Sequence, residues 1–158
     1  MSRTGIGFDS HRFAPGRPLI LAGVRIPHPE GLAGHSDADA VAHAVTDALL
    51  GAAAAGSIGE HFPDADPRWK DADSMELLRR VVAVVRERGL RVVHADVTVI
   101  AEAPRIGPHA SAMAARLEEA LESGPGSVGI KGKTNEGMGF IGRGEGIAVL
   151  ATATLEAR

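Results

Sequence analysis

The chain of 158 residues contains no cysteine and no tyrosine, and aromatic residues make up only 3% of it. The absence of cysteine excludes disulfide bonds, thiol catalysis and cysteine-ligated zinc. No apolar run approaches the roughly 20 residues that a membrane-spanning helix needs. The first residues, MSRTGIGFD, lack the hydrophobic stretch of a secretory signal. We therefore predict a cytoplasmic protein that does not enter a membrane.

The charge balance also limits the possible partners. The formal net charge is −3, and no stripe of basic residues stands out, so nucleic acid is not expected as a partner. Apolar residues make up 44% of the chain, which is typical of a globular protein rather than a disordered one. The length fits one domain, and we assign residues 1–158 to it.

The hydrophobic pattern predicts an α+β fold in which helices pack on one face of a mixed β-sheet, with ferredoxin-like βαβ elements. Strands are expected over residues 3–8, 91–101, 128–131 and 146–155, and a hairpin over 18–27. Helices are expected from Ala38 to about Ala54, from Asp73 or Ser74 to Gly89, and from Pro108 to about Ser123. The second helix carries an apolar stripe at helical spacing, formed by Leu77, Leu78, Val81, Val82 and Val85.

A candidate metal site combines the first strand with the first helix. Asp9 and His11 stand two residues apart at the end of a strand, so both side chains leave the same face. His43 lies one turn into the helix, and Asp39 and Asp47, at i−4 and i+4, are candidates to orient it. Two imidazoles and one carboxylate suit zinc and leave a fourth position open, as in catalytic sites. Spacing alone leaves open a simple turn and a surface histidine.

The start of the first helix is a candidate phosphate site. His35 and Ser36 come just before the helix, and the free N–H groups of a helix N-terminus attract anions. Ser36, followed three residues later by Asp39, also resembles a capping box. The simpler alternative is that Ser36 only caps the helix.

The segment 131–146, KGKTNEGMGFIGRGEG, is rich in glycine, which lets backbone amides curl toward an anion. Its basic residues are Lys131, Lys133 and Arg143, and Thr134 adds a hydroxyl. Glu136 is the exception, and a Mg²⁺ or Mn²⁺ ion that bridges its carboxylate to phosphate would explain it. The alternative is a flexible hairpin between two strands.

Five segments together resemble the 2-C-methyl-D-erythritol 2,4-cyclodiphosphate synthase family, and the resemblance covers essentially the whole chain. They are GFDSHRF (7–13), LAGHSDADAVAHAVTDALLGAAA (32–54), IGEHFPDADPRW (58–69), AEAPRIGPH (101–109) and KTNEGMGFIGRGEGIA (133–148). Each is moderately specific, and their order and spacing together are highly specific.

The resemblance implies a homotrimeric enzyme with active sites between subunits. Asp9, His11 and His43 match the zinc ligands of the family. Glu136 matches the residue that holds a second divalent ion. His35 and Thr134 match positions assigned to transition-state stabilisation.

The other matches are substrate-binding positions. Ser36 matches a phosphate contact, and Lys133 and Asn135 belong to the segment that grips the diphosphate. The loop over the methylerythritol matches Phe62, Pro63, Asp64, Ala65 and Asp66. The cytidine pocket matches Ala101, Glu102, Ala103, Pro104, Arg105, Ile106 and Gly107. The ribose segment matches Ser57, Ile58 and Gly59, with Ser57 standing where many members carry Asp. Phe140 and Arg143 match positions near the substrate and the trimer axis.

The implied substrate is a cytidine diphosphate ester of methylerythritol that bears a 2-phosphate. That phosphate attacks the β-phosphorus, and CMP leaves, which is a phosphorus–oxygen lyase reaction of the non-mevalonate isoprenoid pathway. Two alternatives are a metal-dependent nucleotide-diphosphate hydrolase and a non-catalytic trimer that binds an isoprenoid diphosphate in the cavity on its axis.

Overall fold

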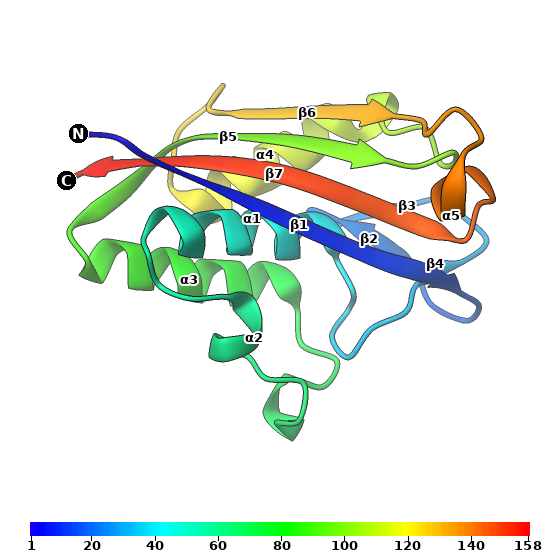
Figure 1. Cartoon of the computed structure of the whole chain (residues 1–158), viewed down its shortest axis with the longest axis horizontal. Coiled ribbons are helices and arrows are strands. Elements are labelled where there is room, and N and C mark those ends of the chain that lie inside the picture. The colour runs from blue at the N-terminus through cyan, green and yellow to red at the C-terminus, as the bar shows by residue number, and fades with distance from the viewer.

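The computed structural model describes residues 1–158, and its centre is a five-stranded sheet with the strand order β4-β1-β7-β5-β6 (Figure 1). The strands are β1 (Arg3–Ala14), β4 (Gly31–Leu32), β5 (Leu90–Ile100), β6 (Val128–Lys133) and β7 (Gly146–Ala157). β5 and β6 pair in parallel, and the other neighbours are antiparallel. The predicted mixed sheet is therefore confirmed. A separate hairpin joins β2 (Leu19–Leu21) to β3 (Val24–Ile26).

Three long helices cover one face of this sheet and leave the other face open (Figure 1). They are α1 (Ala40–Ala52), α3 (Ser74–Glu87) and α4 (Ala110–Leu121). β5, α4 and β6 form a βαβ unit. The short elements are α2 (Ile58–His61), α5 (Gly139–Gly142) and 3₁₀ turns at Pro67–Trp69 and Gly107–His109. None of the helices combines the length and apolar character that crossing a membrane requires.

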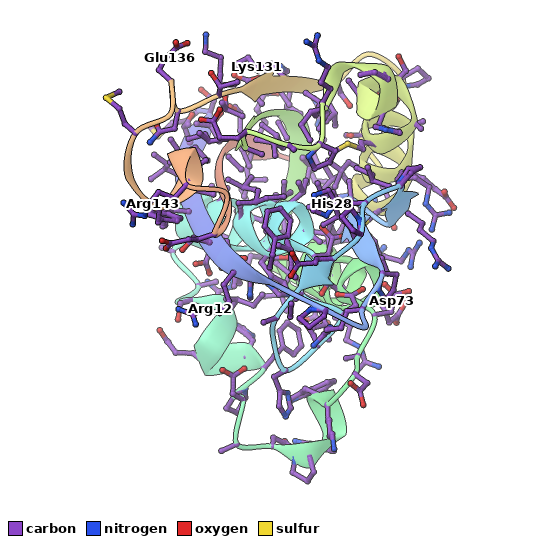
Figure 2. All side chains as sticks on the ribbon, turned by 90° about the vertical axis from the view of Figure 1, so that its right-hand side faces the viewer. Arg12, His28, Asp73, Lys131, Glu136 and Arg143 are labelled. Carbon is purple, nitrogen blue, oxygen red and sulfur yellow. The ribbon has the colours of Figure 1, made fainter.

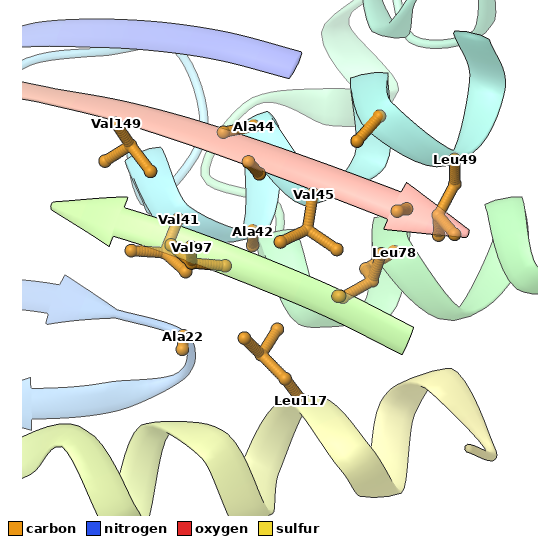
Figure 3. Close-up of a cluster of buried hydrophobic side chains, with 14 of the residues drawn as sticks. Ala22, Val41, Ala42, Ala44, Val45, Leu49, Leu78, Val97, Leu117 and Val149 are labelled. Atoms are coloured by element: carbon orange, nitrogen blue, oxygen red, sulfur yellow. The ribbon is translucent and has the colours of Figure 1, made fainter. Parts of the chain in front are cut away.

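The core lies between the sheet and the three helices. Figure 3 shows Val97 of β5 and Val149 of β7 packed with Val41 and Val45 of α1. All five residues of the predicted stripe on α3 are buried. Burial of a side chain of this size contributes about 1.5–3 kcal/mol to stability. The spacing of the apolar residues in the sequence therefore predicted which face of α3 packs on the core.

β1 extends to Ala14, six residues beyond its predicted end, and α1 lies unusually close to it. A Cβ atom at Gly7 would lie 1.8 Å from the carbonyl oxygen of Ala44, and one at Gly5 would lie 2.2 Å from that of Ala48. Only hydrogen at these two positions lets the helix backbone pack directly on the strand. The close contact places His43 of α1 opposite Asp9 and His11 of β1.

Asp39, and not Ser36, caps α1, so the predicted capping box is wrong. Its carboxylate accepts hydrogen bonds from the backbone N–H groups of Ala42 (3.0 Å), Ala22 (2.8 Å) and Gly23 (2.7 Å). Burial raises the pKa of Asp39 to about 6, although these three hydrogen bonds favour the charged form. The carboxylate thereby ties the turn of the β2–β3 hairpin to the start of α1.

Two glycine substitutions test the contact between β1 and α1. We expect Gly7→Ala to lower the free energy of unfolding by about 3 kcal/mol, the upper end of usual overpacking costs. Gly51→Ala should instead be neutral or add up to about 1 kcal/mol of stability, because its Cβ would meet nothing closer than 3.8 Å. Urea denaturation of both variants measures this. Equal stability of Gly7→Ala and the unmodified protein would contradict the tight contact.

Candidate metal centre and adjoining pockets

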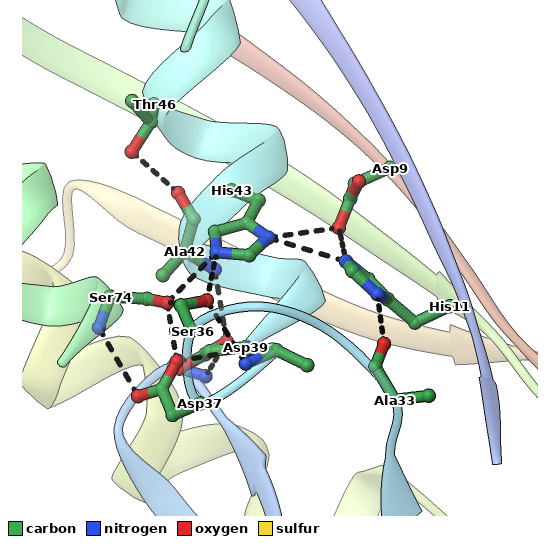
Figure 4. Close-up of polar contacts among 12 residues, drawn as sticks. Asp9, His11, Ala33, Ser36, Asp37, Asp39, Ala42, His43, Thr46 and Ser74 are labelled. Atoms are coloured by element: carbon green, nitrogen blue, oxygen red, sulfur yellow. Dashed lines mark hydrogen bonds and ion pairs between the residues drawn. The ribbon is translucent and has the colours of Figure 1, made fainter. Parts of the chain in front are cut away.

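Asp9, His11 and His43 meet where β1 faces α1 (Figure 4). The Oδ2 atom of Asp9 lies 2.8 Å from Nε2 of His11 and 3.3 Å from Nδ1 of His43. The two ring nitrogens are 3.3 Å apart. One ligand atom from each residue lies within 4.8 Å of the others, which suits a single metal ion. The structure thus brings together three residues that sequence spacing could not connect.

Each imidazole has one ring nitrogen held by a partner outside the cluster. Nδ1 of His11 lies 2.6 Å from the carbonyl oxygen of Ala33. Since a carbonyl can only accept, Nδ1 donates to it, and Nε2 is the ring nitrogen that faces Asp9. Nε2 of His43 lies 2.8 Å from the hydroxyl of Ser74, and Nδ1 faces the cluster. Outer partners of this kind hold the histidines in most metal sites.

The charges in the cluster favour a cation at its centre. Burial would raise the pKa of Asp9, but hydrogen bonds from His11 and His43 outweigh it and lower the pKa to about 2. Burial would lower the pKa of His11, yet its hydrogen bond with Asp9 leaves that pKa raised. The carboxylate therefore stays ionised and attracts positive charge, either a proton on His11 or a metal ion in its place.

Neither carboxylate predicted to orient His43 does so. Asp39 caps α1, and Oδ1 of Asp47 accepts from the backbone N–H of Ile58 at 2.7 Å. Both were selected because they lie one helical turn from His43 in sequence. The residues in contact with Nε2 of His43 are instead Ser74 at 2.8 Å and Ser36 at 3.2 Å.

A cavity of about 250 Å³ opens beside the metal cluster. The predicted residues that line it with the cluster are His35, Ser36, Ile58, Gly59, Phe62 and Asp64. Sequence reasoning missed Trp69 and Leu77, which also line it. Trp69 is the only tryptophan of the chain and ends the segment IGEHFPDADPRW, a signal that could have identified it. Leu77 was assigned to the apolar stripe alone.

Other residues of the 57–66 segment do not line this cavity. The hydroxyl of Ser57 donates to Glu60 at 3.0 Å, and Asp66 forms an ion pair with Arg68 at 2.6 Å. Pro63 and Ala65 are exposed on the loop. Within one chain, therefore, only part of the segment faces the metal cluster.

A second cavity of about 500 Å³ contains most of the predicted cytidine segment. Its lining consists of Ala101, Glu102, Pro104, Arg105, Ile106, Gly107, Pro108, Gly132, Lys133 and Thr134. Ala103 joins two of these residues without lining the cavity. Oε1 of Glu102 accepts from the backbone N–H groups of Asn135 (2.9 Å) and Gly137 (3.2 Å). Glu102 thus holds the glycine-rich loop against the 101–107 segment.

The two cavities have no lining residue in common. His35 and Thr134, both predicted to act on the same transition state, therefore line different cavities of the chain. The spacing of residues in the sequence carried no sign of this separation.

The glycine-rich loop contains the short helix α5, which was not predicted. Glu136 projects outward from the glycine-rich loop (Figure 2), and its backbone has a left-handed φ of 52°. Its Oε1 atom accepts a hydrogen bond from the hydroxyl of Thr134 at 3.3 Å. Lys131 forms an ion pair with Asp96 at 2.6 Å, so the structure does not place it among the phosphate-binding groups. Phe140 lines a third cavity of about 610 Å³, and Arg143 pairs with Glu145, which also lines it, at 2.7 Å.

The chain is similar to one known protein family over nearly its whole length. The model of the YgbB family matches residues 2–156. A protein of Dechloromonas aromatica named 2-C-methyl-D-erythritol 2,4-cyclodiphosphate synthase is 57% identical over 154 residues, 98% of this chain and 96% of that protein. A synthase of the same name from Symbiobacterium thermophilum is 55% identical, with 98% of each chain covered.

Solved structures give the same result. The bifunctional IspDF of Campylobacter jejuni has a TM-score of 0.96 and 44% identity, covering 100% of this chain and 43% of that one. A 2C-methyl-D-erythritol-2,4-cyclodiphosphate synthase in a CDP-bound form has a TM-score of 0.89 and 39% identity, covering 98% of this chain and 100% of that one.

Direct metal titration tests the cluster. We expect the protein to bind one Zn²⁺ per chain, measured by competition with a chromophoric chelator. His43→Ala should weaken binding by more than the roughly 10- to 100-fold that loss of an outer partner costs, because it removes a ligand. His109→Ala, which removes a half-buried histidine at the start of α4, is the control. Equal zinc affinity of all three proteins would remove His43 from the site.

Proposed function

The chain belongs to the YgbB family, and we propose that it converts 4-diphosphocytidyl-2-C-methyl-D-erythritol 2-phosphate to 2-C-methyl-D-erythritol 2,4-cyclodiphosphate and CMP. This is the activity by which its relatives are named, and it belongs to the non-mevalonate isoprenoid pathway. The observation that carries the proposal is the assembled Asp9, His11 and His43 cluster beside a cavity lined by predicted substrate residues. The reaction class is that of a phosphorus–oxygen lyase, and residues 1–158 act as one catalytic domain.

We assign zinc to the cluster because two imidazole nitrogens and one carboxylate oxygen suit that ion. His11 would bind it through Nε2 and His43 through Nδ1, the nitrogens that their outer partners leave free. When bound, the ion would supply Lewis-acid character to a phosphate of the substrate. Three protein ligands leave a position for a phosphate oxygen, as in catalytic sites.

We place the cytidine in the second cavity, where the 101–107 segment can read the base through its backbone. A related synthase has been solved with CDP bound, and so has the Plasmodium falciparum protein. Lys133 and Thr134 line the same cavity, and together with Asn135 they would grip the diphosphate. Glu136 would hold a second ion, Mg²⁺ or Mn²⁺, against the phosphates. Its exposed carboxylate, aimed outward from the loop, supports this role.

The chain's own residues would mainly position charges. An oxygen of the 2-phosphate forms a bond to the β-phosphorus, the bond from that phosphorus to the bridging oxygen breaks, and its electron pair leaves with CMP. The attacking phosphate is already an anion, so no protein base is required. His35 and Thr134 would steady the developing charge, and Ser36 would contact phosphate. Phe62 and Asp64 would enclose the methylerythritol, with Pro63, Ala65 and Asp66 completing that loop and Ser57, Ile58 and Gly59 next to the ribose.

A homotrimer is part of the proposal, and two observations support it. The open face of the sheet exposes large apolar side chains, Phe8 at 57% and Ile6 at 69%, next to Leu150 at 39%. Covering them would remove apolar surface from water, which favours association. The metal cluster and the cytidine segment also line separate cavities, so a neighbouring subunit would be needed to join them.

The third cavity, lined by Phe140 and by the Glu145 partner of Arg143, is where we place an isoprenoid diphosphate near the trimer axis. Arg143 would face the diphosphate. A cytoplasmic location stays a prediction from the sequence.

Phosphorus NMR tests the activity. We expect the zinc-loaded protein, given the 2-phosphorylated substrate and Mg²⁺, to release a cyclic diphosphate and one equivalent of CMP. His43→Ala should lose nearly all turnover, whereas His109→Ala should keep it. CMP together with an open-chain diphosphate would favour a hydrolase, and no turnover with bound metal would favour a binding protein.

Co-expression of two inactive variants tests the shared site. His43→Ala removes the metal cluster, and Gly107→Trp fills the cytidine cavity from a position with open space around it. If each site combines two chains, random mixing should restore about a quarter of the wild-type activity, because one site in four is intact. If each chain holds a complete site, the mixture should stay inactive. Each variant expressed alone is the control.

A further inference from the structure

We propose that Ser74 and Asp37 form a hydrogen-bonded relay that positions His43 for metal binding by holding its outer ring nitrogen. The inference rests on the proposed metal site, and it adds two positioning residues that come from other segments of the chain. Ser74 is the first residue of α3, and Asp37 lies in the loop before α1.

The contacts run in one direction from the cluster into the protein (Figure 4). Nε2 of His43 lies 2.8 Å from the hydroxyl oxygen of Ser74. That hydroxyl in turn donates to Oδ1 of Asp37 through a short hydrogen bond, and Oδ2 of Asp37 accepts from the backbone N–H of Ser74 at 3.2 Å. Ser74 is only 1% exposed, so water cannot replace these partners easily.

The order of donors determines the tautomer of His43. A serine hydroxyl has one proton, and an ionised carboxylate can only accept. Since the Ser74 proton goes to Asp37, its oxygen must accept from His43, and Nε2 of the imidazole must carry a proton. With a metal ion bound, Nδ1 would then be the nitrogen that offers its lone pair, and it is the one that faces Asp9 and His11. A metal ligand needs this lone pair.

Helix capping does not account for the Ser74 hydroxyl. The N-cap of α3 is Asp73, whose Oδ1 accepts from the backbone N–H of Met75 at 2.8 Å. Ser36 offers only a longer contact to Nε2 of His43, 3.2 Å, and its oxygen also accepts from the backbone N–H of Ala38. The Ser74 hydroxyl is therefore the better placed partner of His43, and it takes no part in capping α3.

The loop that carries Asp37 is itself anchored to the segment before α3. The backbone N–H of Asp37 donates to the carbonyl of Ala72 at 3.1 Å, and that of Asp71 donates to the carbonyl of His35 at 2.9 Å. Asp37 and Ser74 are thus brought together by two backbone hydrogen bonds as well as by their own contacts. The relay links α3 to the metal cluster on α1 and β1.

Zinc affinity of substituted proteins tests the relay independently of turnover. We expect Ser74→Ala to raise the zinc dissociation constant about 10- to 100-fold, and Asp37→Asn to raise it less because its amide oxygen can still accept from Ser74. Thr46→Val is the matched control, since it removes a buried hydroxyl of α1 that bonds the carbonyl of Ala42 and not His43. Unchanged affinity in Ser74→Ala would overturn the proposal.

Nitrogen NMR of the histidine rings in the unmodified, zinc-loaded protein provides a second measurement that needs no variant. We expect the proton of His43 on Nε2 and that of His11 on Nδ1, with the metal on the other nitrogens. Metal on Nε2 of His43 would overturn the relay even if Ser74→Ala failed to fold. Correct tautomers and zinc affinities without cyclisation would contradict the proposed function and leave the relay standing.

Discussion

The candidate site depends on one steric constraint, the direct contact of α1 with β1. Gly5 and Gly7 have no Cβ atoms, and the carbonyl groups of Ala48 and Ala44 occupy the space that such atoms would need. The next two residues of β1 on that face are Asp9 and His11. A wider spacing would carry His43 away from both of them. The ligand atoms lie within 4.8 Å of one another because the backbone of α1 touches β1 at Ala44, the residue after His43.

Adjacent residues of the loop before α1 make different contacts. His35 and Ser36 face the cavity beside the metal cluster, Asp37 contacts Ser74, and Asp39 binds the hairpin turn and the first turn of α1. Each of these carboxylates is held by backbone N–H groups. Buried carboxylates are tolerated only with such partners. The polar residues of this loop therefore serve the fold and the site together, and a change at one would disturb both.

The sequence predicted the helices and the mixed sheet, because periodicity and glycine positions report on local structure. Residue type and the family resemblance identified the three candidate metal ligands, although spacing alone could not connect His43 with Asp9. It failed where the answer lay in tertiary contacts. Asp39 and Asp47 were assigned to His43 because they lie one turn away on the same helix. Ser74, the actual partner, is 31 residues distant and reaches His43 only through the packing of α3 on α1. The family resemblance assigned residues to one active site. Only the coordinates show that these residues line two separate cavities of the chain.

Under the proposed trimer, the open face of the sheet would serve both subunit assembly and the chemistry of the site. Phe8 pairs across the strands with Leu150, and the same strand β1 carries Asp9 and His11 on its opposite face. Alternation along one strand thus directs apolar side chains to the open face and the candidate metal ligands toward α1. Since the cytidine segment begins where β5 of the same sheet ends, burying the open face against other copies would also set the distance between the two halves of a shared site. Under the proposed trimer, the apolar contact between subunits and the completeness of the active site are consequences of one arrangement. This is why a chain with a well-formed metal cluster can still hold its predicted nucleotide segment in a separate cavity.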